Sequence, residues 1–324
     1  MKTLFLFTFL FIAHTVLAQD RKYIVVARDS TGDFSTIQEA VNAVRDFSYF
    51  PVKIFIKKGV YHEKLIIPSW KTGITLQGES RDSVIITNAD YTGKPIPGGS
   101  IAGKDKFVTF TSHTVLVEGD NITMENLTIE NTAGNVGQAV ALHVEGDCCI
   151  IRNCTLLGNQ DTLYAGKAGS RQYYDSCYIE GTVDFIFGAA TAIFLNCSIH
   201  SKRDAYITAA STTKDQPYGF VFMNCKLTAD TLITKVYLGR PWRPYSATIF
   251  MNCMLGKHII PAGWHNWDKT TNEQTARYAE YKNTGPGAAT GQRVAWSHQL
   301  TDKDAKIITV TKVFKGWDPL KLTY

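Results

Sequence analysis

Short runs of alternating apolar positions recur through the middle of the chain, and each run closes with Asn or Ser followed by Cys or Leu. Examples are CIIRNCTLLGN, AIFLNCSIHSK and FVFMNCKLTAD. The closing positions are 27, 23, 20, 28 and 28 residues apart, at Asn126, Asn153, Ser176, Asn196, Asn224 and Asn252. Such intervals match one turn of a solenoid, and no long helical pattern interrupts residues 107–256. The pattern therefore predicts an all-β chain folded as a single-stranded parallel β-helix.

Five cysteines follow the repeat and share one phase: Cys154, Cys177, Cys197, Cys225 and Cys253. In stacked coils one phase becomes one interior column, where we expect buried free thiols rather than disulfides. Cys148 and Cys149 lie outside this column, and the pattern assigns them no state.

The repeat also creates Asn-X-Ser/Thr sequences at Asn121, Asn126, Asn153 and Asn196. Most of these fall inside predicted strands. We therefore expect them to form a ladder of stacked amides rather than to carry glycans.

The segment DFSTIQEAVNAV near the N-terminus has a helical period. Ser35 stands three residues before Gln38, as in a capping box, and Ile37, Val41 and Val44 share one face. We expect a short capping helix over the open end of the solenoid. No linker divides the chain, so residues 19–324 form one predicted domain, and its part from about residue 265 onward packs along the outside of the coils.

The first residues, MKTLFLFTFLFIAHTVLAQD, have the pattern of a signal peptide. Lys2 precedes an apolar stretch, and Val16 and Ala18 occupy the small-residue positions of a cleavage site. The apolar run is shorter than the roughly 18–20 residues that span a bilayer. We expect residues 1–18 to be removed and the mature protein to be secreted, extracellular or periplasmic, with no membrane segment.

Charge and motif content exclude several classes of function. The formal net charge is +5, and lysines and arginines cluster no further than short pairs such as Lys57–Lys58, which argues against nucleic-acid binding. The eight histidines include no HExxH pattern, and no Gly-rich phosphate loop is present. The sequence predicts neither a metal nor a cofactor.

Two aspartates occupy equivalent positions of consecutive coils. Asp161 lies eight residues after Asn153, and Asp184 lies eight residues after Ser176 within the apolar segment GTVDFIFG. Neighbouring parallel strands are about 4.8 Å apart, so we expect the two carboxyl groups side by side. Since two adjacent carboxylates do not both ionise readily, one becomes an acid and the other stays ionised. Asp204, eight residues after Asn196, is a weaker candidate for a third member.

Other motifs supply the groups that such a carboxyl pair needs. In LGRPWRPYS, Arg240 offers a forked donor to a carboxylate, and Trp242 offers a flat surface to a sugar ring. Gln138 and Gln160 supply neutral amide donors that can stabilise an oxyanion.

In this order, GQAVAL, GNQDTLYA, GTVDFIFG and LGRPW resemble the signature segments of pectinesterases, or pectin methylesterases, and the resemblance extends over most of residues 23–268. It implies a right-handed parallel β-helix that acts without metal on methyl-esterified polygalacturonate. It also implies that Asp184 is the nucleophile and Asp161 the acid/base. Arg240 is then the residue that orients Asp184.

The same resemblance assigns oxyanion stabilisation to Gln138 and Gln160. Trp242, Tyr164 and Phe187 then form an aromatic cleft that binds homogalacturonan. The segment ITAASTT departs from the family, which often has Arg after ITA, so contacts at that point do not carry over. We expect a monomer.

Three alternatives fit the same repeat. One is a pectate lyase or polygalacturonase, although the acidic clusters that those enzymes use are missing from the motifs. Another is an esterase or thioesterase of this fold with a different substrate. The last is a carbohydrate-binding solenoid without catalysis, which the set of Asp, Arg and Gln residues disfavours.

Overall fold

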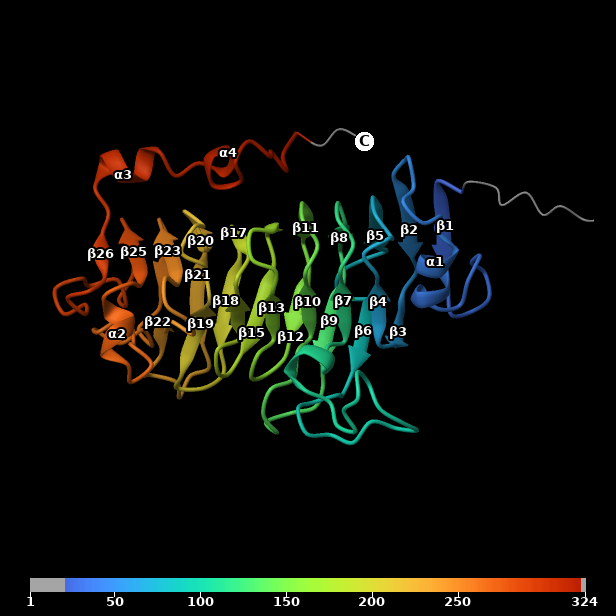
Figure 1. The fold of residues 1–324 in the computed structure, drawn as a ribbon, viewed down its shortest axis with the longest axis horizontal. Coiled ribbons are helices and arrows are strands. Elements are labelled where there is room, and N and C mark those ends of the chain that lie inside the picture. Colours follow the sequence, from blue (N-terminus) through green and yellow to red (C-terminus); the bar gives the residue numbers. More distant parts are fainter. Residues whose placement is uncertain (1–20, 322–324) are drawn as a thin grey trace, which may run out of the picture.

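The computed structural model describes residues 21–321 and consists mainly of a solenoid built from three parallel sheets (Figure 1). Apart from the first two strands and the last two, which pair directly with each other, consecutive strands belong to different sheets, and each strand pairs in parallel with the strand one coil before it. The chain is thus a right-handed parallel β-helix, which confirms the predicted fold class.

The three sheets contain 11, eight and seven strands among the described residues. The first is formed by β1 (Tyr23–Val26), β2 (Val52–Ile56), β5 (Ile74–Gly78), β8 (Thr123–Glu125), β11 (Cys149–Arg152), β14 (Arg171–Asp175), β17 (Thr191–Leu195), β20 (Phe220–Met223), β23 (Ala247–Met251), β25 (Arg277–Tyr281) and β26 (His298–Gln299). The second is formed by β3 (Gly59–His62), β6 (Val84–Asn88), β9 (Thr128–Asn131), β12 (Thr155–Leu157), β15 (Tyr178–Gly181), β18 (Ser198–Ser201), β21 (Lys226–Ala229) and β24 (Met254–Leu255). The third, which we call the site sheet, is formed by β4 (Leu65–Ile67), β7 (Val115–Val117), β10 (Leu142–Val144), β13 (Leu163–Ala165), β16 (Ile186–Gly188), β19 (Tyr206–Ala210) and β22 (Tyr237–Gly239).

The repeated Asn and Ser positions form the corners between the first and second sheets. All six have a left-handed backbone, with φ from 48° to 57°. Asparagine tolerates this conformation better than most residues, which explains the repeat. The expectation that the sequons lie inside strands is therefore wrong. One stacked amide contact is present, since Asn153 Nδ2 donates to Asn126 Oδ1 at 2.7 Å.

Columns of identical or similar side chains fill the interior. The five in-phase cysteines are buried and free, as predicted, and Cys148 and Cys149 are also free. On four successive strands of the first sheet, the rings of Tyr174, Phe194, Phe222 and Phe250 stack with centroid separations of 4.7, 4.4 and 4.3 Å. This continuous packing gives the site sheet a rigid support.

Helix α1 (Ile37–Ala43) covers the N-terminal end of the solenoid beside β1 (Figure 1), as predicted. Its cap is Thr36, whose side chain accepts a hydrogen bond from the Glu39 backbone N–H, so the predicted pair Ser35 and Gln38 is displaced by one residue. The Glu63 carboxylate accepts two further N–H groups of the first turn, at 2.9 Å each.

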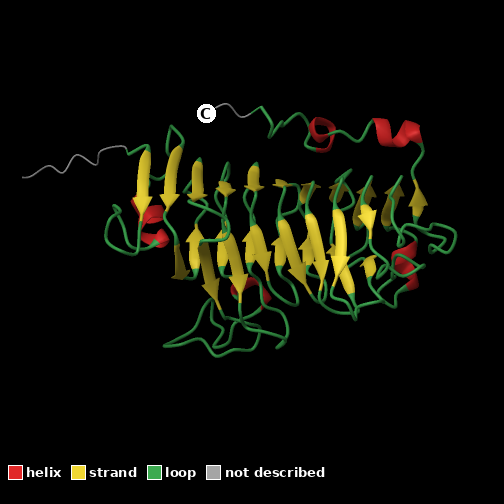
Figure 2. Cartoon of the chain, turned by 180° about the vertical axis from the view of Figure 1, so that it is seen from behind, coloured by secondary structure: helices red, strands yellow, loops and turns green. Residues whose placement is uncertain are grey.

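The C-terminal region both extends the solenoid and runs along it. Strand β25 adds to the first sheet, which the sequence did not predict. Helix α2 (Thr270–Glu273) precedes β25, whereas α3 (Asp302–Lys306) and α4 (Val310–Val313) lie along the outside of the first sheet (Figures 1 and 2). There Phe314 packs edge-on against Tyr173 at 6.4 Å, so the predicted outer packing is confirmed for this segment.

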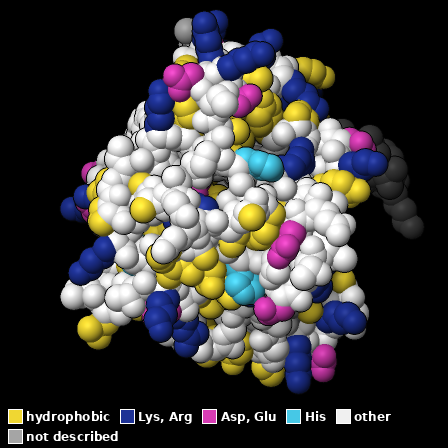
Figure 3. All heavy atoms as spheres, turned by 90° about the vertical axis from the view of Figure 1, so that its left-hand side faces the viewer, with side chains coloured by type: hydrophobic (Ala, Val, Ile, Leu, Met, Phe, Trp, Pro, Cys, Tyr) yellow, Lys and Arg dark blue, Asp and Glu magenta, His cyan; other side chains and the backbone are white. Residues whose placement is uncertain are grey.

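Three predictions from the sequence concern the signal peptide, membrane-spanning segments and the distribution of positive charge. The signal peptide at residues 1–18 lies outside the described residues. Within residues 21–321, no helix has the length and apolarity needed to cross a bilayer. In the view of Figure 3, with the C-terminal end of the solenoid facing the viewer, Lys and Arg side chains are scattered around the outline.

Candidate active site

The two candidate aspartates lie on neighbouring coils where the chain enters the site sheet. Asp161 precedes β13 by two residues and Asp184 precedes β16 by two residues, and Leu163 pairs in register with Ile186. The Asp161 N–H donates to the carbonyl of Val183 at 3.1 Å, directly beside Asp184. The expected adjacency of the two aspartates is therefore present.

Both aspartates have a left-handed backbone, with φ of 64° at Asp161 and 49° at Asp184. Aspartate is among the few residues that adopt this conformation readily, although it is still less favourable than an extended one. The strain recurs at the same point of two coils and directs both side chains into one pocket. Because the surrounding ladder fixes the backbone, the two carboxyl groups are held in place before any ligand binds.

Arg240, which follows β22, binds the Asp184 carboxylate through two parallel hydrogen bonds. Its Nε donates to Oδ1 at 2.9 Å and its Nη2 donates to Oδ2 at 2.7 Å. The guanidinium lies between the rings of Tyr206 and Trp267, with its carbon 3.9 and 3.7 Å from the ring centroids. The two rings leave the guanidinium little freedom, so Arg240 holds one orientation of Asp184.

The surroundings of the two carboxyl groups favour a different protonation state for each. Burial and the adjacent charge of Asp184 raise the pKa of Asp161 well above its usual range. Burial also raises the pKa of Asp184, but the hydrogen bonds and charge of Arg240 oppose that shift. The pair is thus arranged so that Asp161 keeps a proton while Asp184 is ionised.

The carboxyl pair opens into a pocket of about 200 Å³, which we call the catalytic pocket. Its lining consists of Thr109, Phe110, Gln138, Gln160, Asp161, Asp184, Phe187, Ala209, Arg240, Trp242 and Trp267. Gln138 and Gln160 form a parallel bridge on adjacent coils, which places their amides on the same wall. Counting the weaker candidate Asp204, seven of the nine candidate residues predicted from the sequence therefore meet here.

Tyr164 does not line this pocket. Its ring lies between Phe187 and His143, at 4.5 Å from each centroid, and it pairs in register with Phe187, so it continues the aromatic surface beside the pocket. Asp204 also lies elsewhere, since its carboxylate accepts the N–H groups of Thr234 and Lys235 at 2.8 Å.

Register explains why Asp204 is misplaced. Ile186 pairs with Thr208, so the residue one coil beyond Asp184 is Tyr206. Counting a fixed eight residues from Asn196 ignores two extra residues in that turn. The sequence did not predict Tyr206 and Trp267, whose rings hold Arg240. It also did not predict Phe110 and Thr109, which line the pocket. The aromatic pair in GWHNW was the available signal for Trp267.

Within residues 21–321, no group of three or more His, Cys, Asp or Glu side chains is arranged to hold a metal ion. The catalytic pocket supplies carboxyl, guanidinium and amide groups. These are the Asp184 carboxylate bound by Arg240, the Asp161 carboxyl group beside it, and the amides of Gln138 and Gln160.

Comparison with known proteins supports this interpretation. The family model described as Pectinesterase matches residues 23–317. The chain belongs to the pectinesterase family. Pectinesterase 31 of Arabidopsis thaliana is 37% identical over 282 residues, covering 86% of this chain and 88% of that protein. Probable pectinesterase/pectinesterase inhibitor 23 of the same plant is 38% identical over 312 residues, or 91% of this chain, and the chain spans 53% of its length.

Solved pectinesterase structures have the same fold. The pectin methylesterase from carrot superposes with a TM-score of 0.82 at 37% identity, covering 90% of this chain and 93% of that one. The pectin methylesterase from Erwinia chrysanthemi superposes with a TM-score of 0.79 at 31% identity, covering 91% of this chain and 98% of that one. The chain spans about half to three fifths of several curated plant pectinesterases that it matches.

Proposed function

We propose that this pectinesterase hydrolyses the methyl esters of polygalacturonate, releasing methanol and free galacturonate carboxylates. The observation that carries the proposal is the paired carboxyl site, in which Arg240 binds Asp184 through two hydrogen bonds while Asp161 lies beside it on the next coil. Family membership gives the reaction class, and a pectin methylesterase has been solved in complex with a hexasaccharide.

In the first step, ionised Asp184 attacks the ester carbonyl carbon and forms a tetrahedral intermediate. Both Asp184 oxygens accept hydrogen bonds from Arg240, so the guanidinium orients the carboxylate and keeps it ionised. The carbonyl oxygen becomes an oxyanion, and the amides of Gln138 and Gln160 donate to it.

The intermediate then collapses, and the bond between the carbonyl carbon and the methoxy oxygen breaks. Asp161 gives its proton to the departing oxygen, and methanol leaves. The raised pKa of Asp161 keeps that proton available at neutral pH. An anhydride between Asp184 and the substrate remains.

In the last step, the Asp161 carboxylate accepts a proton from a water molecule, and the hydroxide attacks the anhydride. The bond to Asp184 breaks, which returns Asp184 as a carboxylate and Asp161 as a neutral acid. The same residue therefore acts first as acid and then as base.

The proposed partner is methyl-esterified homogalacturonan. Phe187 and Trp242, whose rings meet edge-on at 5.9 Å, offer sugar-stacking surfaces beside Asp184, and Tyr164 supports Phe187. We further propose that residues 19–324 act as one secreted, monomeric catalytic unit after removal of residues 1–18.

The test is incubation of the purified protein with highly methylated pectin in the presence of a chelator. We expect methanol release with no loss of viscosity. Unsaturated sugar ends would indicate a lyase, and rapid depolymerisation would indicate a polygalacturonase. Either result, or the absence of methanol, would refute the proposal.

A further inference from the structure

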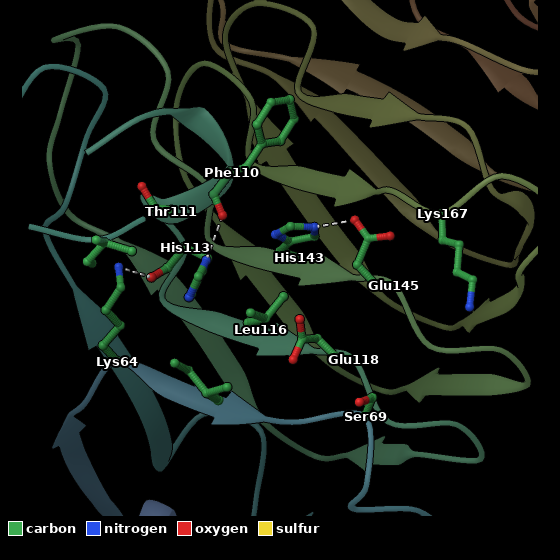
Figure 4. A pocket seen from close by; sticks show the side chains of 12 residues that line it. Lys64, Ser69, Phe110, Thr111, His113, Leu116, Glu118, His143, Glu145 and Lys167 are labelled. Atoms are coloured by element: carbon green, nitrogen blue, oxygen red, sulfur yellow. Dashed lines mark hydrogen bonds and ion pairs between the residues drawn. The ribbon is translucent and has the colours of Figure 1, made fainter. Parts of the chain in front are cut away.

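The two sides of the catalytic pocket are built differently. On its N-terminal side the pocket adjoins a cavity of about 600 Å³, and Phe110 lines both. The wall of that cavity stands on paired strands of the site sheet, with Leu116 on β7 and His143 on β10 (Figure 4). On its C-terminal side the pocket is lined by Trp267, which lies in no strand. The position of Trp267 therefore depends on contacts other than a sheet ladder.

Trp267 has a backbone conformation that tryptophan rarely adopts. Its φ is 63°, and the φ of the next residue, Asp268, is 54°. A left-handed backbone is unfavourable for a bulky residue and persists only where the surrounding contacts impose it. The strained turn places the Trp267 ring over Arg240, with the guanidinium carbon 3.7 Å from the ring centroid. The contacts that impose this turn therefore also determine how Arg240 is held.

His265 supplies one of these contacts. The Trp267 N–H donates to His265 Nδ1 at 3.0 Å, so this nitrogen carries no proton. The imidazole also packs against Tyr206, the other ring beside the guanidinium, with 5.3 Å between the ring centroids. The backbone N–H of His265 donates to the carbonyl of Gly239 at 3.1 Å, at the end of β22. One side chain thus contacts both residues whose rings hold Arg240.

Asn272 in helix α2 supplies the other contact. The residue is 5% exposed, and its Nδ2 donates to the Pro241 carbonyl and to the Asn266 carbonyl, each at 3.2 Å. Pro241 follows Arg240 in the chain, and Asn266 precedes Trp267. The two N–H groups of one buried amide therefore join the two segments that meet at the guanidinium.

We propose that Asn272 and His265 are positioning residues for the ester hydrolysis. They hold Trp267 against Arg240, and the guanidinium in turn orients the Asp184 carboxylate through its two hydrogen bonds. Neither Asn272 nor His265 lines the catalytic pocket. The inference rests on the proposed function, and it adds two residues outside the pocket on which that reaction depends.

The experiment measures kcat and KM for methanol release from highly methylated pectin as a function of pH. Asn272→Leu removes both donors at nearly constant volume, and His265→Phe removes the acceptor but keeps a ring beside Tyr206. We expect each variant to lower kcat by about 5- to 50-fold with a smaller change in KM, since a catalytic group displaced by about 1 Å loses up to about 10²-fold in rate. Arg240 opposes the rise in the pKa of Asp184, so both variants should also lose activity at a higher pH on the acid side.

Two further variants separate positioning from general destabilisation. His265→Asn places an acceptor oxygen close to the position of Nδ1, so it should recover most of the kcat that His265→Phe loses, although the ring is gone. The matched control is Asn283→Leu, which removes an amide that accepts the Cys253 N–H at 2.9 Å and lies outside the catalytic pocket. It should lower the melting temperature and leave kcat and the pH profile unchanged.

The outcomes separate this inference from the proposed function. If the wild-type protein releases no methanol, the proposed function itself fails. If it does, but Asn272→Leu and His265→Phe keep kcat within about twofold and the wild-type pH profile, the two residues do not position Arg240. The positioning role is also refuted if Asn283→Leu gives the same losses, or if His265→Asn is no better than His265→Phe. Should one variant fail to fold, as its melting curve will show, the variant at the other residue decides.

Discussion

Arg240→Lys is the most informative perturbation of the catalytic pocket, because it preserves charge while changing geometry. Arginine makes two parallel hydrogen bonds to Asp184 and lies between the rings of Tyr206 and Trp267. Lysine offers one compact ammonium, which cannot reproduce the fork or the stacking.

The contacts of Arg240 set the expected loss of catalytic efficiency in Arg240→Lys. One charge-assisted hydrogen bond is worth about 1.5–3 kcal/mol. Losing the guanidinium from between the two rings removes about 0.5–1 kcal/mol more. The sum of about 2–4 kcal/mol corresponds to about a 30- to 1000-fold fall in kcat/KM, at about 1.4 kcal/mol per factor of ten.

The assay is methanol release from highly methylated pectin as a function of pH. Arg240 opposes the rise in the pKa of Asp184, so the variant should also lose activity at a higher pH on the acid side than the wild type does. The control is Arg152→Lys, at an arginine paired with Glu125 and Asp175 in the first sheet. If Arg240→Lys stays within about threefold of the wild type with an unchanged pH profile, the reasoning is wrong.

Three further predictions test the acid, the oxyanion site and the core. Because the pKa of Asp161 is raised in the native state, the native protein binds this proton more tightly than the unfolded chain does. The stabilisation that this proton gives is therefore complete below about pH 3.8 and is lost as the pH rises through the native pKa of Asp161. Asp161→Asn removes that loss, so its gain in Tm over the wild type should grow from about pH 3 to about pH 8 in calorimetry; a constant difference would contradict this. Gln160→Leu should lower kcat by about 10²–10³-fold with a smaller change in KM, and steady-state kinetics with an unchanged kcat would remove Gln160 from the oxyanion site. Phe222→Ala, within the buried ring stack, should lower the free energy of unfolding by about 3–5 kcal/mol in denaturant titrations, whereas Leu232→Ala, 88% exposed, should change it by less than about 0.5 kcal/mol.

The sequence predicts the solenoid well because the corner of each coil has a chemical requirement. A left-handed backbone at Asn153, Asn196 and their equivalents favours asparagine, which makes the repeat visible without any structure. The same phase correctly places Asp161 beside Asp184. It fails at Asp204, because coil length varies, and only the strand register identifies Tyr206 as the next position.

The features of the site and the fold that the sequence pattern does not predict depend on contacts between distant segments. Trp267 reaches Arg240 from a loop after the last strand of the site sheet, and no periodicity relates the two residues. Strand β25 was not predicted because its segment mixes polar residues with apolar ones.

Asp184→Asn tests the proposed nucleophile most directly. The amide keeps the shape of the side chain but cannot attack a carbonyl, and Arg240 keeps one of its two hydrogen bonds to this side chain together with its contacts to Tyr206 and Trp267. Methanol release from highly methylated pectin should fall by at least about 10³-fold, with binding of the polymer retained. Methanol release within about tenfold of the wild-type rate would show that Asp184 does not form the covalent intermediate.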